Sequence, residues 1–430
     1  MTQASKHRFR RYTDWAKLVS GVGLAQVMVQ GLTMLTGLMV VRFLRPSDYA
    51  YYTLAAGVLG FLSVIMDSGM SAGSYTVGGQ IWKDPKALGD LVFTLKLLRN
   101  KFMVLGAIFS IPLLGLLLLK NGAPWMTVIG LCLACCIQIV VGLPAMIYGL
   151  APALHQKISK TQKIAVVQSS LRLSLVGAGL LILPSSIMAY LAAIPAQIYA
   201  NIKLKKLTEK LTIHGEINTN YKNSLLGSVK RIFPGSLYYA LSGQITVLLV
   251  SIVGNTHTLA EVGALGRLGQ VLTIFSATAG VILVPRFARM EASPWRLSKI
   301  YVGILSCIVF LGSLICISAW LFPDAILWVL GSHYSNLGPQ LLLQFISASI
   351  GLFCGIAYQL GAVRGIIYSP YLAIPTALIY QILGLLVFDF TKVEGVLFFA
   401  IGLSCIQAIQ IVAYFIGTTL NGRRYVEIAQ

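Results

Sequence analysis

The sequence predicts an all-α polytopic membrane protein with twelve transmembrane helices in two six-helix halves. Three observations support this fold class. Hydrophobic residues make up 57% of the 430 residues, charged residues make up only 11%, and the mean hydropathy is +0.80. The apolar residues form long runs, and basic residues alternate between those runs. A soluble chain averages about 25% charged residues, and one water-soluble core could not bury so much apolar surface.

The apolar runs give the positions of the expected spans. A helix needs about 20 apolar residues, at about 1.5 Å each, to cross about 30 Å of hydrocarbon. Twelve runs qualify, at residues 18–41, 50–71, 102–119, 125–150, 164–183, 187–202, 232–253, 262–284, 300–322, 341–363, 370–388 and 395–418. Only the short sequence LPSS separates the fifth run from the sixth.

The basic residues indicate how the spans are oriented. Of the 33 Lys and Arg, 27 lie in segments on the side of the N-terminus. Two more fall inside spans, and the other side holds only Arg42, Arg45, Lys120 and Lys392. This asymmetry follows the positive-inside rule and places both termini in the cytoplasm. Because the basic residues alternate with the spans, the net charge of +20 indicates no nucleic-acid partner.

The segment richest in Lys and Arg, residues 203–231, divides the spans six and six. We expect an N-terminal half at 1–202, a cytoplasmic basic linker at 203–231 and a C-terminal half at 232–430. The linker ends in YKNSLLGSVKRIF, which is typical of a short amphipathic segment at the membrane surface. At an offset of 213 residues the two halves match weakly, with Asp48 falling on Glu261. This arrangement is the one expected of a transporter built from parallel repeats.

Five expected spans carry polar or small residues on one helical face. They are Gly23, Gln26, Gln30, Thr33 and Gly37 on the first; Gln168 and Arg172 on the fifth; Gly263, Arg267 and Gln270 on the eighth; Gln344, Ser347, Gly351, Gly355 and Tyr358 on the tenth; and Gln407, Gln410 and Tyr414 on the twelfth. Such a stripe is either a close helix–helix seam or the wall of a hydrated cavity. Because two of the five stripes contain Arg, we expect at least two of them to face one cavity.

Arg172 and Arg267 are the two basic residues inside spans. An Arg at a helix centre costs about 2.5–3.5 kcal/mol on insertion scales. Each side chain could extend to the membrane surface. Alternatively, each guanidinium could bind a phosphate or carboxylate with two hydrogen bonds. The second interpretation makes both residues candidates for contact with an anionic head group.

Asp67 is the only acidic residue within an expected span. It could neutralise a cavity Arg, carry a coupling proton or lie at the membrane surface. No second carboxylate and no His lie in mid-span, and general acid–base chemistry needs a positioned titratable pair. We therefore do not expect an enzyme.

All seven Cys lie within expected spans, so a disulfide framework is not expected. Cys132, Cys135 and Cys136 lie close together, but their helix contains no His or carboxylate. We interpret them as packing residues and expect neither a metal nor a cofactor.

The stretch VVRFLRPSDYAYYTLA, residues 40–55, resembles the entrance motif of a known family. The family is the polysaccharide-transporter branch (Wzx-type O-antigen flippases) of the multidrug/oligosaccharidyl-lipid/polysaccharide (MOP) exporter superfamily. The matching residues are Arg42, Leu44, Pro46, Asp48, Tyr49 and Tyr52. Ala50 stands where the family usually has Gly, and the second Tyr is offset by one position. The segments around 261–290 and 322–351 are similar to the second half of such flippases.

The resemblance implies a MOP/MATE-like fold and a flippase in the bacterial inner membrane. Its substrate would be an undecaprenyl-pyrophosphate-linked oligosaccharide, carried by alternating access through a cationic cavity. Membrane lipids and a polysaccharide polymerase would be its other partners. Arg172 and Arg267 would then contact the head group, and Gln26, Gln30, Thr33, Gln168, Gln270, Gln344 and Tyr358 would bind the sugars, with Asp67 as a charge-pair or coupling residue.

Three other functions remain open at this point. A drug or cation antiporter of the same superfamily usually relies on an intramembrane carboxylate, and the first expected span has none. A membrane-embedded glycan polymerase or ligase tends to have a large outer loop with Arg or His. Here the longest outer loop, residues 323–340, has no Lys or Arg and only His333. A purely structural partner of a polysaccharide assembly is the third.

Overall fold

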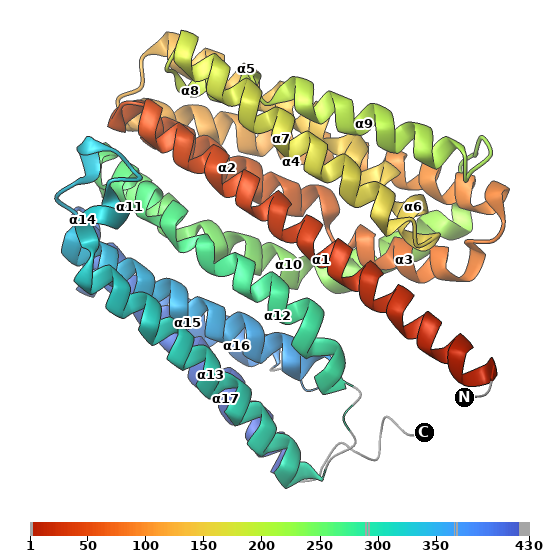
Figure 1. Ribbon diagram of the computed structural model, residues 1–430. Helices are drawn as coiled ribbons and strands as arrows, with labels where there is room; N and C mark the ends of the chain where they lie inside the picture. The colour runs from red at the N-terminus through yellow and green to blue at the C-terminus, as the bar shows by residue number, and fades with distance from the viewer. Residues whose placement is uncertain (1–2, 289, 291–292, 365, 367–368, 421–430) are drawn as a thin grey trace. The chain divides into compact units, whose positions relative to one another are not determined.

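The computed structural model describes the backbone of residues 3–288, 290, 293–364, 366 and 369–420. It gives side-chain positions for most of these residues, the longest gaps being 3–20 and 238–245. Within this part of the chain every regular element is a helix, as predicted (Figure 1). The chain divides into two compact units, Met1–Ala260 and Glu261–Gln430, which we call unit 1 and unit 2 and describe separately.

The described residues of unit 1 form ten helices and the first turn of another. They are α1 (Gln3–Phe43), α2 (Pro46–Asp67), α3 (Met70–Ile81), α4 (Pro85–Lys120), α5 (Trp125–Tyr148), α6 (Leu150–Leu154), α7 (Ile158–Ile182), α8 (Ser186–Leu191), α9 (Ile194–Glu209), α10 (Thr219–Val253) and the start of α11 (Thr256–Gly269).

Local sequence explains where several of these helices begin and end. Pro46 occupies the first helical turn of α2, where its missing N–H leaves no bond unmade. Ser68 and Gly69 both adopt left-handed backbone angles, and this break separates α2 from α3. The Asp84 carboxylate caps α4 by accepting bonds from the N–H groups of Lys86 and Ala87.

The core of unit 1 forms where α2, α4, α5 and the start of α10 meet. Leu62, Leu91, Leu95, Leu143 and Leu225 belong to one buried cluster there. Much of the rest of the apolar surface is exposed, as Phe109 and Leu116 show on α4. Exposed apolar side chains on long helices are expected where the surrounding medium is hydrocarbon.

The segment before the seventh expected span differs from the prediction. The sequence YKNSLLGSVKRIF does not form a separate helix, because α10 runs unbroken from Thr219 to Val253, and its position at the membrane surface stays a prediction. The polar stretch ahead of it packs against the start of α4. There the Ile213 N–H donates to the Pro85 carbonyl and the Glu216 N–H to the Asp90 carboxylate. A loop that satisfies its backbone in this way is part of the fold.

Unit 2 contains the rest of α11, then α12 (Val271–Ala288), α13 (Pro294–Leu321), α14 (Pro323–Leu327), a 3-10 turn η1 (Ser332–Tyr334), α15 (Gly338–Ala362), α16 (Pro370–Val387) and α17 (Val393–Leu420). The central helix is α15, which packs against α12, α13 and α17. The rings of Tyr301 and Phe415 stack with centroids 3.8 Å apart and join α13 to α17.

Each of the twelve expected spans is largely helical, but four contain a break: residues 50–71 and 125–150 are broken near one end, at Ser68–Gly69 and at Gly149, and two others are broken further inside. Residues 187–202 are divided between α8 and α9, and residues 262–284 between α11 and α12 with a turn at Gln270. Among the described residues, eight helices are long and apolar enough to cross a membrane. The chain is therefore a multi-pass membrane protein, and the inside placement of the two termini stays a prediction. The C-terminal residues 421–430 lie outside the described part.

Candidate functional site

The polar stripe of the first span lies partly against α7. Gln162 on α7 donates from Nε2 to Oε1 of Gln26 at 3.3 Å. Further along the two helices, a Cβ at Gly177 would lie 2.6 Å from the Met39 side chain. Close approach of this kind is how small residues bring membrane helices together. Part of the α1 stripe is therefore a helix seam.

Gln30 and Thr33 complete that stripe. Gln30 is half-buried, and Thr33 is exposed. The Thr33 hydroxyl donates to the Val29 carbonyl of its own helix at 2.8 Å. Such back-bonding satisfies the hydroxyl within the helix. Its oxygen keeps acceptor capacity for another polar group.

Gln168 begins a chain of amide side chains that crosses three helices. Its Nε2 donates to Gln197 on α9 at 2.6 Å, and Gln197 donates to Asn201 at 3.3 Å. Asn201 in turn donates to the Val141 carbonyl of α5 at 2.6 Å. These bonds hold α7, α9 and α5 together in the absence of water. Gln197 and Asn201 were not among the expected site residues, although they are four residues apart on one face of α9, and this spacing is the signal that could have revealed them.

Arg172 lies one helical turn beyond Gln168 on α7. Its side chain is half-buried, and its Nε is buried without a hydrogen-bond partner in the described part of the chain. A guanidinium carries five N–H donors and is always charged. Arg172 thus provides positive charge and unused donor capacity in the middle of a span.

Asp67 lies at the end of α2 and pairs with Arg99 of α4. The Arg99 Nη2 donates to Asp67 Oδ1 at 2.6 Å and to the Ser71 hydroxyl at 2.7 Å. Ser71 also donates to the Asp67 carboxylate, and Arg99 Nη1 donates to the Met146 carbonyl of α5. The Arg99 side chain is 1% exposed, whereas that of Asp67 is 30% exposed. One cluster therefore joins α2, α3, α4 and α5.

Unit 2 brings another set of expected residues near each other. Gln344 on α15 lies beside Gly269. A Cβ added at Gly269 would be 2.8 Å from Nε2 of Gln344. Gln270 forms the turn between α11 and α12, next to that contact. Arg267 is half-buried in the last turn of α11, and Tyr358 is 43% exposed on α15. Gln344, Gln270 and Gly269 thus gather where the eighth span is broken.

Arg364 is a further arginine whose role the sequence did not reveal. Its Nη2 donates to the Phe287 carbonyl at 2.6 Å and to the Met290 carbonyl. Its guanidinium also lies 5.5 Å from the centre of the Phe287 ring. Arg364 therefore caps the end of α12, where a positive charge is favourable.

Several of the residues behind the family resemblance are packing residues, whereas Arg42 is exposed. Tyr49 and Ala50 are fully buried in the first turns of α2. The ring of Tyr52 stacks on Tyr190 of α8 with centroids 4.8 Å apart, and the Tyr190 hydroxyl donates to the Tyr52 carbonyl. This stretch builds a corner of unit 1, which explains why it predicts a fold better than a substrate.

Comparisons by sequence and by structure give different results. No family model matches the chain, and no curated protein matches it significantly. The solved structures that are similar in fold include three transporters. They are the inward-facing conformation of a multidrug resistance MATE family transporter of the MOP superfamily (13% identity, 94% of this chain and 99% of that chain, TM-score 0.62), the outward-facing conformation of such a transporter (14%, 94% and 96%, 0.60) and the Vibrio cholerae MATE transporter VcmN in the bent form (16%, 95% and 99%, 0.59). The helices of this chain are thus arranged in a MATE-like fold.

Proposed function

We propose that the chain is a flippase that moves an anionic lipid-linked oligosaccharide from the inner to the outer leaflet of a bacterial inner membrane. The proposed substrate is a glycan carried on undecaprenyl pyrophosphate. The protein would expose a cationic cavity alternately to each side of the membrane. Arg172 is the residue that we propose for contact with the pyrophosphate.

One observation carries the proposal: the distribution of charge among the spans of unit 1. The Asp67 carboxylate is bonded by Arg99 and by Ser71. Arg172 has no acidic partner within the described residues, and its Nε makes no hydrogen bond there. The unmatched charge is therefore positive. A positive group in a low-dielectric site favours phosphate or carboxylate and disfavours organic cations.

The fold comparison supports alternating access. This chain is similar in fold to both an inward-facing and an outward-facing MATE transporter, at TM-scores of 0.62 and 0.60. We infer that the arrangement of helices is compatible with both states. Gln26, Gln30, Thr33, Gln168, Gln270, Gln344 and Tyr358 stay our candidates for hydrogen bonds to sugars, and Arg267 for a second contact with the head group.

A drug or cation antiporter is the second candidate function. Two of the similar structures are described as multidrug resistance transporters, which favours it. A cation would need an accessible carboxylate, and Asp67, the acidic residue inside an expected span, has 30% of its side chain exposed. The ion pair with Arg99 makes this carboxylate a weak cation site, because a fully buried guanidinium already bonds to it.

Arg172→Ala tests the proposed substrate. The full-length protein would be reconstituted in liposomes that contain a fluorescent undecaprenyl-pyrophosphate disaccharide, and transfer between leaflets would be followed by quenching from outside. We expect Arg172→Ala to slow transfer about tenfold or more, because one charge-assisted bidentate contact contributes roughly 1.5–3 kcal/mol. Arg172→Lys keeps the positive charge but cannot make the two parallel hydrogen bonds of a guanidinium. Its transfer rate should lie between that of the unaltered protein and that of Arg172→Ala.

Lys163→Ala is the matched control, because it removes one positive charge from an exposed position on the same helix. Its transfer rate should equal that of the unaltered protein. If Arg172→Ala transfers the lipid as fast as Lys163→Ala does, the proposed site is wrong. Efflux of a cationic dye, with no transfer of the lipid-linked sugar, would favour the antiporter instead.

A further inference from the structure

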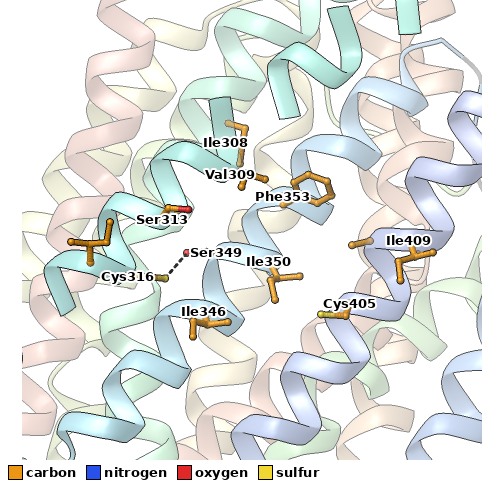
Figure 2. Close-up of a pocket in the computed structure, with 13 residues that line it drawn as sticks. Ile308, Val309, Ser313, Cys316, Ile346, Ser349, Ile350, Phe353, Cys405 and Ile409 are labelled. Carbon is orange, nitrogen blue, oxygen red and sulfur yellow. Dashed lines mark hydrogen bonds between the residues drawn. The ribbon is translucent and has the colours of Figure 1, made fainter. Parts of the chain in front are cut away.

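Unit 2 contains an apolar groove to which the proposed function assigns no role. The groove has a volume of about 610 Å³ and lies between α13, α15 and α17. Figure 2 shows side chains from all three helices around it. We call it the α13–α15–α17 groove. Its volume falls within the range of about 300–1,000 Å³ that is usual for small-molecule sites.

The lining of the groove is apolar and stiff. Its walls are formed largely by Ile308, Val309, Ile317, Ile346, Ile350 and Ile409, and no lining residue carries a charge. Side chains branched at Cβ have one strongly preferred rotamer in a helix. The groove is therefore held open by its own walls and does not depend on flexible side chains.

The floor of the groove is a close contact between α13 and α15. A Cβ on Gly312 would lie 3.0 Å from Cβ of Ser349. The Ser349 hydroxyl lies 3.9 Å from the Cys316 sulfur and makes a weak hydrogen bond with it (Figure 2). This pair engages two of the polar groups of the lining with each other, and most of the remaining lining is apolar, so the groove offers little to a polar ligand.

The groove lies at hydrocarbon depth. Its lining residues come from the middle of α13 (Pro294–Leu321), α15 (Gly338–Ala362) and α17 (Val393–Leu420). All three helices are long and apolar enough to span a membrane. Val309, Ile317 and Ile409 at its edge are between 51% and 69% exposed. A groove at this depth, with an exposed apolar edge, opens to lipid tails.

The two faces of α15 separate polar from apolar contacts. Gln344, Gly351 and Gly355 lie on one face, and this face packs on α11 and α12 through the contacts at Gly269 and Ser276. Ile346, Ile350 and Phe353 line the groove, and helical spacing places them on the opposite face. The polar stripe predicted from the sequence therefore points away from the groove.

We propose that the α13–α15–α17 groove binds the isoprenoid chain of the lipid-linked substrate, an inference that rests on the proposed function. At this depth an occupant must be a hydrocarbon chain, because no water is available to fill the space. Double bonds and methyl branches restrict an isoprenoid chain, so it loses less conformational entropy in a shaped site than a saturated acyl chain does. Binding there holds the tail in the bilayer while the head group crosses.

Photochemical labelling tests this proposal. The full-length protein would be placed in lipid nanodiscs with an undecaprenyl monophosphate that carries a diazirine on its chain, and labelled peptides would be identified by mass spectrometry. We expect label on residues 308–317, 346–353 or 405–409. Ala408→Trp fills the groove and should reduce this labelling about tenfold, because the indole ring occupies the space in which the chain would pack and the chain can enter only by distorting the walls. Ser313→Phe fills it from α13 and should act in the same way.

Ala413→Trp is the matched control, because it adds the same side chain to an exposed position of α17 outside the lining. Unchanged labelling in both Ala408→Trp and Ser313→Phe would overturn the proposal. Equal labelling by a diazirine phosphatidylglycerol would also overturn it, since the groove would then hold ordinary membrane lipid.

The transport assay separates this proposal from the proposed function. If Arg172→Ala loses transfer while Ala408→Trp and Ser313→Phe keep full labelling, the groove does not bind the isoprenoid chain and the flippase function stands. If these two variants lose labelling but Arg172→Ala transfers the lipid normally, the groove does bind the isoprenoid chain and the proposed head-group site at Arg172 is wrong.

Discussion

Arg99 and Asp67 form an ion pair with 2.6 Å between Nη2 and Oδ1, and the arginine side chain is only 1% exposed. Asp67 is the last residue of α2, just before α3, and Arg99 lies in the first half of α4. Arg99 also donates a hydrogen bond to the Met146 carbonyl of α5. Removing a charge from water costs several kcal/mol, which the partner and its hydrogen bonds must offset. The pair therefore acts as a single structural unit.

Arg99→Ala should destabilise unit 1 strongly. Without its partner the Asp67 carboxylate loses its compensating charge, and breaking a buried pair in this way costs about 3–5 kcal/mol. The double variant Arg99→Leu/Asp67→Leu leaves no uncompensated charge and should lose less stability than Arg99→Ala alone. Apparent melting temperatures in detergent, followed by the fluorescence of a thiol-reactive dye, would measure the difference.

The exposed pair Lys205–Glu209 on α9 is the control for this series. Its atoms are 3.7 Å apart, and both side chains are more than half exposed. Lys205→Ala should change stability by about 0.5 kcal/mol or less. If the double variant is as unstable as Arg99→Ala, the loss comes from packing, and our account of the charge pair is wrong.

Asp67→Asn distinguishes a structural role for Asp67 from a role in proton coupling. The amide keeps the size of the side chain and one acceptor for Arg99 but cannot exchange a proton. Because Arg99 and Ser71 already engage the carboxylate, we expect transfer of the lipid-linked sugar to show the same pH profile in Asp67→Asn as in the unaltered protein. The assay is the liposome measurement, repeated at several pH values for the unaltered protein and for Asp67→Asn. A transfer rate that no longer depends on pH would show that Asp67 couples a proton.

The pair also shows how far the sequence could predict the site. The third expected span begins at residue 102, which leaves Arg99 among the basic residues of a loop. In the structure α4 begins at Pro85, because Leu88, Leu91, Leu95 and Leu98 continue the apolar face before the membrane run starts. Arg99 is four residues after Leu95 and therefore lies on that face. An arginine in phase with a leucine stripe is the signal that could have revealed it.

Other parts of the site have no signal in one sequence. Apolar runs predict where helices lie, since a run must pair its backbone within a helix to cross lipid. The partners of polar residues depend on which helices pack together. Gln168 forms a stripe with Arg172 in sequence, yet it bonds Gln197, 29 residues away, on another helix. Periodicity places a side chain on a face of its own helix but does not identify the helix opposite.

Gly89→Ala should disrupt the docking of the loop before α10. A Cβ at Gly89 would overlap the Ile213 carbonyl, and a Cβ at Gly215 would overlap the Gly89 backbone. Backbone atoms cannot rotate away as a side chain can, so the loop must move and lose the bond from Ile213 to Pro85. We expect faster proteolysis within residues 210–218 and a lower melting temperature for Gly89→Ala.

Gly227→Ala is the matched control for that substitution. Gly227 lies on an exposed face of α10, and a Cβ there would meet no atom within 4 Å. In a helix interior Ala is favoured over Gly by about 1 kcal/mol, so this variant should be at least as stable as the unaltered protein. Equal stability of the two variants would mean that the loop is not held against α4.

Cysteine labelling on α1 tests whether the polar stripe meets water. A Cys at position 30 replaces the half-buried Gln30, whereas a Cys at position 28 replaces Met28, which is 51% exposed. Helical spacing separates the two positions by about 200°. A charged methanethiosulfonate reagent reacts with the thiolate and therefore requires water at the site. In a variant without the seven native Cys, we expect position 30 to react faster than position 28, even though Met28 is the more exposed residue, because exposure to lipid does not ionise a thiol. Equal or slower reaction at position 30 would make the stripe a dry seam between α1 and α7, and would leave Arg172 without a hydrated route to its ligand.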